Sequence, residues 1–338
     1  MSTMQEVAKK AGVSKATVSR VLSGKGYVSE ATRKQVFAAI EAAGYRPNLL
    51  ARNLATSTSQ CIGMVVTNTL YSGSYFSEIL SQAAKKVEES GRQLILVDGK
   101  HSAQQEREAI EFLLDLRCDA IILYPRFLSI DDLDEIIEQT RQPIMVVNRR
   151  LRKHPSHAVC CDHHASALAA TQALIARGHQ RIAFITGSPD SPTALERLAG
   201  YKAALRQAGL PDEPKLIVEG KWTPACGAQA VARLLAQRIA FSALIASNDD
   251  MAVGALKQLN AAGLAVPEQV SLLGFDDIPV APFLRPALAS VKAPVTGMIH
   301  EVIDRLIFML DGGDSLPSQA FTCGLILRES VADAAAEK

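Results

Sequence analysis

The hydrophobic positions near the amino terminus follow the period of an α-helix. Apolar residues that share one helical face recur every three or four positions, at Met4, Val7, Ala8 and Ala11. Thr3 and Glu6 have the spacing of a capping box, which places the start of the helix at Met4. Gly12 follows, where a tight turn needs a positive φ. The pattern therefore predicts a short helix that ends in a sharp turn.

Two more helices are predicted after this turn. Ser14 caps a helix over about residues 15–22, with an inward face of Val18, Val21 and Leu22. Ser29 caps a third helix, with inward positions Val36, Phe37 and Ile40. The spacing of Ala8, Gly12 and Val18 is that of a helix-turn-helix, whose second helix can enter a DNA major groove. A small helical bundle without a role in DNA binding is the alternative.

Beyond residue 60 the pattern changes to short, continuous apolar runs separated by amphipathic stretches. The runs cover residues 62–67, 93–98, 119–124, 143–148, 157–162, 181–186, 215–220, 243–247 and 270–275. Continuous apolar strands that alternate with helices indicate an α/β fold with parallel sheets covered on both faces. Because nine strands are many for one sheet, we predict two doubly wound lobes, with a break at the polar, Pro-containing stretch 151–156.

These patterns divide the chain into a helical head at residues 1–45, a hinge helix and linker at 46–59, and an α/β body at 60–338. The charge follows the same division. Residues 1–60 contain nine Lys or Arg and three acidic residues, a net charge of +6, whereas the rest of the chain carries 27 basic and 32 acidic residues, a net charge of −5. A basic head on an acidic body favours a module that binds a polyanion.

The second predicted helix presents the residue types that contact DNA. Lys15, Ala16 and Arg20 are the candidate base-reading residues, because an Arg can bind guanine through two hydrogen bonds. The short polar side chains of Thr17, Ser19 and Asn48 are candidates for phosphate contacts that set the register.

The stretch after the head is unusually apolar for a linker. Pro47 suits the start of a helix, and residues 48–55 have helical composition. A helix of this length is unstable alone, since isolated helices below ~12–15 residues are marginal. We expect it to form when two copies meet on DNA, with Ala51 and Leu54 in the minor groove and Leu54 as the wedge that kinks it. A plain linker is the alternative.

Polar side chains follow the predicted strands of the body, at the edge where ligands of doubly wound sheets bind. They include Asn68, Asn148, Asn248, Asp249, Asp276 and Asp277, and Arg197 and Trp222 come from intervening loops or helix starts. Carboxylates, amides and a guanidinium can meet sugar hydroxyls, and an aromatic face can cover the ring. Trp222 could instead be a core aromatic, and Asp249 and Asp277 are the residues that we expect to cap helices.

Other kinds of chemistry have weaker support. Residue types that bind metals stand together at Cys160, Cys161, Asp162, His163 and His164. Because neighbouring strand residues point to opposite faces, these side chains cannot all reach one ion, and we predict no metal site and no cofactor. The six cysteines are expected to be buried thiols. No nucleophile elbow, kinase motif or phosphate loop is present. No apolar run approaches the ~20 residues of a membrane span and no signal peptide opens the chain, so a cytoplasmic protein is expected.

With the stretches VAKKAGVSKATVSRVLSG and YRPNLLARNLA, the chain closely resembles the lactose/galactose repressor (LacI/GalR) family over essentially its whole length. The resemblance is strongest to members that control the use of β-glucosides such as cellobiose, arbutin and salicin. It implies a body like that of periplasmic binding proteins, with an effector held by Asn148, Arg197, Trp222, Asn248 and Asp276.

The resemblance also implies several chain crossings between the lobes. The N-terminal lobe is then expected at about 60–156 and 290–320, and the C-terminal lobe at about 157–289 and 321–338. Because the end of the chain lacks a leucine heptad, we expect a homodimer and not a tetramer.

The expected function is therefore a repressor that binds a near-palindromic DNA operator and is released by a small sugar or glucoside. Two alternatives share the predicted body: a bilobed sugar-binding protein without a transcriptional role, and a cytosolic sugar enzyme with a fused DNA-binding head. The basic head argues against the first. The second would require an acid/base pair or a metal among the cleft residues, whose types favour recognition over chemistry.

Overall fold

Three helices form the amino-terminal unit of the computed structural model: α1 (Met4–Lys10), α2 (Lys15–Ser23) and α3 (Glu30–Ala43). The structure describes residues 3–23, 26–45, 58–67, 73–314, 316–317 and 319–334. The chain divides into two units, Met1–Ser59 and Gln60–Lys338. The predicted hinge residues Asn48, Ala51 and Leu54, and the candidate effector residue Asn68, lie outside the described residues.

The predicted signals at the helix ends are confirmed. Thr3 and Glu6 form the capping box of α1, and Gly12 has a φ of +61° at the turn. The Ser14 hydroxyl accepts the Thr17 N–H at 3.1 Å. The helices enclose a core that includes Val7, Val18, Val21 and Val36. Phe37 was predicted to face inward, and this was wrong: its side chain is 50% exposed, because the α3 face that meets the core runs through Val36, Ala39 and Ile40.

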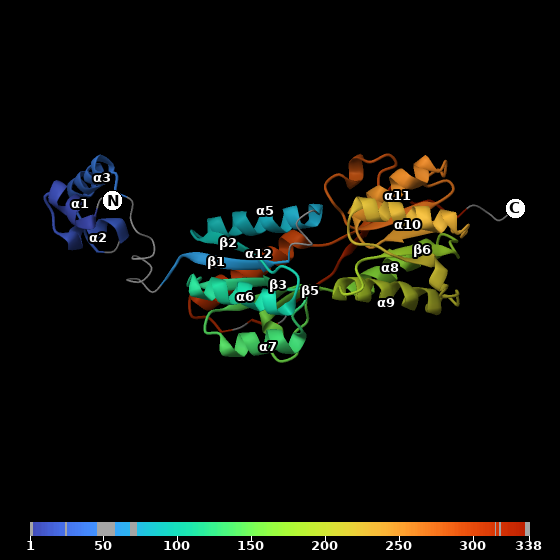
Figure 1. The fold of residues 1–338 in the computed structure, drawn as a ribbon, viewed down its shortest axis with the longest axis horizontal. Helices are drawn as coiled ribbons and strands as arrows, with labels where there is room; N and C mark the ends of the chain where they lie inside the picture. Colours follow the sequence, from blue (N-terminus) through green and yellow to red (C-terminus); the bar gives the residue numbers. More distant parts are fainter. Residues whose placement is uncertain are drawn as a thin grey trace. The chain divides into compact units, whose positions relative to one another are not determined.

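The second unit contains two six-stranded sheets, each covered by helices on both faces (Figure 1). The first has the strand order β11-β5-β4-β3-β1-β2, and all its pairings are parallel. Its strands are β1 (Cys61–Val66), β2 (Gln93–Asp98), β3 (Ala120–Tyr124), β4 (Ile144–Val147), β5 (Ala158–Cys161) and β11 (Gln319–Phe321). Helices α5 (Ser74–Glu89) and α12 (Val295–Leu310) pack on one face, and α6 (Ala103–Asp115) and α7 (Ile130–Gln139) on the other.

The second sheet has the order β12-β10-β9-β8-β6-β7, in which only β12 is antiparallel to its neighbour. Its strands are β6 (Ile182–Thr186), β7 (Ile217–Glu219), β8 (Ala243–Ala246), β9 (Ser271–Asp276), β10 (Ala289–Lys292) and β12 (Gly324–Ile326). Helices α8 (His163–Ile175) and α9 (Pro192–Gln207) cover one face, and α10 (Pro224–Ala236) and α11 (Asp249–Ala261) the other. This confirms the predicted α/β body with two doubly wound lobes.

The chain crosses between the two lobes three times: between β5 and α8, between β10 and α12, and between β11 and β12. The predicted boundaries are corrected at two of these places. The strand within 157–162 was assigned to the C-terminal lobe, but β5 pairs with β4 of the first sheet. Residues 290–292 were assigned to the N-terminal lobe, but β10 pairs with β9 of the second sheet. Both segments are apolar strands beside a crossover, and their composition does not reveal which sheet they join.

The central strands of the two sheets are continuous apolar runs, and helices cover both of their faces. All residues of β3, β4, β5 and β8 are buried.

Helices α10 and α11 approach each other closely because each has a glycine at the contact. A Cβ on Gly227 would lie 2.0 Å from the Met251 carbonyl oxygen, and one on Gly254 would lie 1.7 Å from that of Pro224. Among the described helices, none is long and apolar enough to cross a membrane.

Candidate functional site

A cleft between the two lobes brings together most of the predicted effector residues. Its empty space, about 760 Å³ with the solvent at its mouth included, lies between side chains of both lobes. The first lobe contributes α5 and the ends of β3 and β4, and the second lobe contributes α8 and α9 and the ends of β8 and β9. Five predicted residues line it: Asn148, Arg197, Trp222, Asn248 and Asp276.

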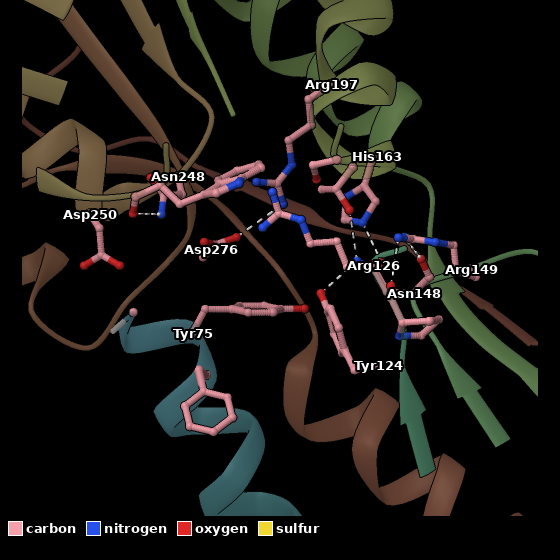
Figure 2. A pocket seen from close by; sticks show the side chains of 16 residues that line it. Tyr75, Tyr124, Arg126, Asn148, Arg149, His163, Arg197, Asn248, Asp250 and Asp276 are labelled. Carbon is pink, nitrogen blue, oxygen red and sulfur yellow. Dashed lines mark hydrogen bonds and ion pairs between the residues drawn. The ribbon is translucent and has the colours of Figure 1, made fainter. Parts of the chain in front are cut away.

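The centre of the cleft is an ion pair of two side chains that are 5% and 9% exposed (Figure 2). Arg197, on α9, donates to Asp276 at the end of β9 at 3.2 Å, and it also donates to the Ser247 carbonyl. Its guanidinium carbon lies 4.4 Å above the centre of the Phe275 ring. Burial raises the pKa of the Asp276 carboxyl, and Arg197 acts in the opposite direction. The ion pair has no net charge, and it presents a donor and an acceptor in fixed positions to a ligand.

Asn148 connects the lobes through both ends of its amide. Its Nδ2 donates to the Tyr124 hydroxyl at 2.9 Å and, across the cleft, to the Thr193 hydroxyl at 3.1 Å. Its Oδ1 lies 2.6 Å from His163 Nε2. Because the amide oxygen only accepts, His163 carries its proton on Nε2. Burial, and then the charges of Arg197, Arg149 and Arg150, lower the pKa of His163 well below its usual range, so the ring is neutral.

Trp222 and Asn248 form the opposite wall of the cleft. Asn248 caps α11 by accepting the Met251 N–H at 3.0 Å, and it donates to the Trp222 carbonyl at 3.0 Å. The Trp222 ring lies against Gly187, where a Cβ would come within 1.9 Å of the indole. Trp222 therefore packs on the core and also lines the cleft, so it fits both the expected effector-wall role and the alternative of a core aromatic.

Three of the cleft residues have strained backbones. Asn148, Trp222 and Asp276 have φ values of 64°, 67° and 102°, in the region that side chains other than glycine rarely adopt. Such strain is held by surrounding structure and is concentrated at functional sites. All three side chains line the cleft: Asn148 directly follows β4, Asp276 ends β9, and Trp222 lies in the loop before α10.

Asp249 and Asp277 were expected to cap helices, and neither does. Asn248 is the cap of α11, and Asp249 accepts the Ser290 hydroxyl at 2.7 Å and the Ile278 N–H at 2.9 Å. Asp277 forms an ion pair with Arg328 at 2.7 Å. Both aspartates therefore stabilise the second lobe beside the cleft.

The residues considered as metal ligands have other partners. Asp162 caps α8 by accepting the Ala165 N–H at 2.8 Å, and Cys161 lies 3.2 Å from the Met298 sulfur. Within the described ranges, no group of three His, Cys, Asp or Glu side chains is placed to hold a metal ion. His163 belongs to the cleft instead.

Sequence reasoning missed several residues that line the cleft: Tyr75, Tyr124, Arg126, Arg149, His163, Thr193 and Asp250. Two of them carry further contacts between the lobes. Arg126 forms an ion pair with Asp190 at 2.9 Å, and Asp250 accepts from the Ser74 N–H at 3.4 Å. Arg149 directly follows Asn148 at a strand end, which is a signal that could have included it.

In the amino-terminal unit, the candidate DNA-contacting side chains share the outer face of α2. Lys15, Ala16, Ser19 and Arg20 are exposed and Thr17 is partly exposed, whereas Val18 and Val21 are buried. The face is therefore supported by a core and presents its polar groups outward, as a recognition helix does.

Comparisons with known proteins agree with this arrangement. Residues 3–48 match the model of bacterial regulatory proteins of the lacI family, and residues 171–331 match a periplasmic binding protein-like domain. The HTH-type transcriptional regulator AscG of Escherichia coli (strain K12) is 64% identical over 331 residues, 98% of each chain. The chain belongs to the lacI family.

Solved structures of this family cover the whole length. A lac repressor dimer bound to its operator and the anti-inducer ONPF is 27% identical, with a TM-score of 0.87 over 98% of this chain and 99% of that one. A complex of the transcriptional regulator CelR with cellobiose is 31% identical, with a TM-score of 0.71 over 98% and 100%. The present lacI-family protein is a sequence-specific DNA-binding transcriptional repressor with a periplasmic binding protein-like domain, and it is not an enzyme.

Proposed function

We propose that this repressor controls a β-glucoside utilisation operon in the cytoplasm and that a β-glucoside in the cleft releases it from its operator. The observation that carries the proposal is the composition of the cleft wall. An indole face at Trp222 suits the C–H side of a sugar ring, and the Arg197–Asp276 pair supplies both a donor and an acceptor for neighbouring hydroxyls.

The comparisons support a sugar with this linkage. CelR, whose complex contains cellobiose, has the same fold and is 31% identical to this repressor. Cellobiose is itself a β-linked glucoside. Asn148 and Asn248, on opposite sides of the cleft, provide amide groups that can distinguish hydroxyl positions on such a ligand.

On the DNA side, we propose that Lys15, Ala16 and Arg20 contact bases and that Thr17, Ser19 and Asn48 contact phosphates. Two copies would place their α2 helices on a near-palindromic operator, and Ala51 and Leu54 would enter the central minor groove. The lac repressor dimer on its operator supports this assembly.

The release mechanism rests on contacts between the lobes. The Asn148–Thr193 and Arg126–Asp190 contacts join opposite walls of the cleft, so a ligand between these walls changes how the lobes are held. The ligand shifts the balance between DNA-binding and released states only by its different affinity for them.

A mobility-shift assay with the full chain tests this function. Palindromic DNA selected by the protein from a random pool is titrated in the absence and presence of cellobiose, salicin, arbutin and galactose. We expect a specific shift that β-glucosides weaken and galactose does not. A specific shift that no β-glucoside changes would contradict the proposed effector.

A further inference from the structure

The two ends of the cleft differ in charge. At one end lie Asp250 and Asn248, and at the other lie Arg149, Asn148 and His163 (Figure 2). Asn248 donates to the Trp222 carbonyl, so Trp222 belongs to the first of these ends. The neutralised Arg197–Asp276 pair lies between these ends. A neutral sugar makes no use of this difference in charge. An anionic ligand would be attracted to the end that holds Arg149.

Arg149 is the cation that defines the basic end. Its guanidinium donates to the Asn148 carbonyl at 3.0 Å and to the Pro125 carbonyl at 2.8 Å. Among the described residues, no carboxylate lies within 4.0 Å of it, whereas Arg126 pairs with Asp190 and Arg197 with Asp276. Burial lowers the pKa of Arg149, yet an arginine stays charged at neutral pH. A partly buried cation without a carboxylate is costly unless an anion joins it.

Two carboxylates, Glu106 and Glu196, act on the charge of Arg149 without an ion pair to it. The buried one, Glu106, does not serve as that anion, because it accepts the N–H groups of Arg126 at 2.7 Å, Phe127 at 3.0 Å and Leu128 at 2.9 Å. Its Oε1 also accepts the Thr67 hydroxyl at 2.6 Å. The charge of Glu106 is thus held by the loop after β3, and the guanidinium of Arg149 keeps donors for the cleft.

The start of α9 adds a second feature that favours an anion at the same end. Ser191, the cap of this 16-residue helix, and Thr193 in its first turn both line the cleft. A helix start carries a partial positive charge. In α9 the first residue, Pro192, has no N–H and the Ala194 N–H donates to the Ser191 hydroxyl at 3.5 Å, so the helix offers an anion its field and its hydroxyl groups. The Thr193 oxygen accepts from Asn148, which leaves the Thr193 hydroxyl proton for a ligand. Arg149 and α9 come from different lobes, so an anion between them would hold the lobes together.

We infer that the effector is a sugar phosphate, with its phosphoryl group between Arg149 and the start of α9 and its sugar ring toward Trp222. This deepens, and rests on, the proposed response to a β-glucoside. A phosphate monoester suits this end because its several oxygens can accept from a guanidinium fork and from hydroxyls at once. A phosphate on the exocyclic primary carbon projects beyond the ring and leaves the ring hydroxyls for the Arg197–Asp276 pair.

Calorimetry on the full-length repressor tests the inference with three probes: methyl β-D-glucoside, its 6-phosphate and inorganic phosphate. We expect the 6-phosphate to bind at least about tenfold more tightly than either other probe, since charge-assisted hydrogen bonds at a partly buried site contribute that much. Equal affinities for the two glucosides would overturn the inference. Inorganic phosphate that binds as tightly as the sugar phosphate would also overturn it, because the site would then hold an adventitious ion only.

Variants separate recognition of the phosphate from support of the strand ends. Arg149→Gln should reduce the ratio between the two glucosides to near one, and Arg149→Lys should restore part of it because the charge returns. Arg150→Gln is the matched control: Arg150 is 62% exposed, pairs with Asp162 and does not line the cleft. It should keep the wild-type ratio. If Arg149→Gln weakens both glucosides by the same factor, Arg149 has only a structural role and the inference fails.

The outcome is separable from that of the proposed function. A repressor that binds the neutral glucoside as well as its phosphate, and leaves its operator with either, overturns the phosphate subsite and supports the β-glucoside response. A folded repressor that binds DNA but neither glucoside overturns both.

Discussion

The indole of Trp222 occupies the space that a side chain on Gly187 would need. A Cβ there would lie 1.9 Å from one ring carbon and 2.2 Å from the next. Gly187 follows β6 in the second lobe, so the end of this strand fixes the position of the aromatic wall. Because Gly187 has no side chain, the Trp222 ring can lie where it lines the cleft.

Gly187→Ala should weaken effector binding, because the ring must move out of the position in which it covers a sugar. We expect a loss of about tenfold or more, of the size that displaced aromatic contacts give. Titration of the intrinsic fluorescence of Trp222, the only tryptophan of the chain, measures both the affinity and the change in ring environment. Gly324→Ala is the control, since nothing lies within 4 Å of its added Cβ. Unchanged effector affinity in Gly187→Ala would contradict the assignment of Trp222 to the effector wall.

Asn148→Ala should weaken effector binding through the loss of a contact between the lobes. The variant removes the 3.1 Å hydrogen bond to Thr193 and leaves His163 Nε2 without its partner. An unsatisfied buried donor and a lost bond together predict a loss of about tenfold or more. Effector titration measures it, and thermal unfolding reports how much of the loss is structural. An affinity within about twofold of the wild type would show that Asn148 does not support the closed cleft.

The contribution of the buried histidines to the stability of the repressor should fall as the pH is lowered through about 6.5, the usual histidine pKa. Burial lowers the pKa of His163 in the folded state, and also that of His179, so the unfolded chain takes up these protons first. Stability is then full above this pH and is lost below it, until the folded-state pKa is reached. Each group can contribute at most about 1.4 kcal/mol per pH unit.

Denaturant unfolding between pH 7.5 and 5.5 checks this prediction. Asp249 and Asp276, whose pKa values are raised by burial, act in the opposite direction, so the comparison is between the wild type and His163→Gln. The variant should show a smaller loss of stability over this range. Identical pH profiles would indicate that His163 is not buried as a neutral ring.

Arg20→Ala should weaken binding to the selected operator by about tenfold to a hundredfold, the range expected for one lost base contact. Binding to random DNA should change much less, because that binding depends on phosphate contacts. Fluorescence anisotropy with both DNAs measures the two effects. Lys34→Ala removes an exposed cation from α3 and should change both affinities by a similar, small factor. The base-reading role is wrong if Arg20→Ala lowers both affinities equally.

The sequence predicted the helical head and all nine of the proposed strands of the body, because helix periodicity, caps and continuous apolar runs are local signals. It also predicted five residues that meet in the cleft, because ligands of doubly wound sheets bind at the carboxyl ends of the strands. The sheet that β5 joins was not predictable, since an apolar strand beside a crossover can pair with either sheet. His163 was considered only as a metal ligand, because its contact with Asn148 depends on the placement of α8 beside β4.

We propose that the cleft and the DNA-binding unit are linked, so that each ligand changes the affinity of the repressor for the other. The affinity of the full-length repressor for its effector is measured by Trp222 fluorescence, with and without saturating operator DNA. Because linkage is reciprocal, operator DNA must weaken effector binding by the same factor by which the effector weakens operator binding. Linkage therefore requires two equal factors, both greater than one. Equal effector affinity in the presence and absence of operator would contradict it.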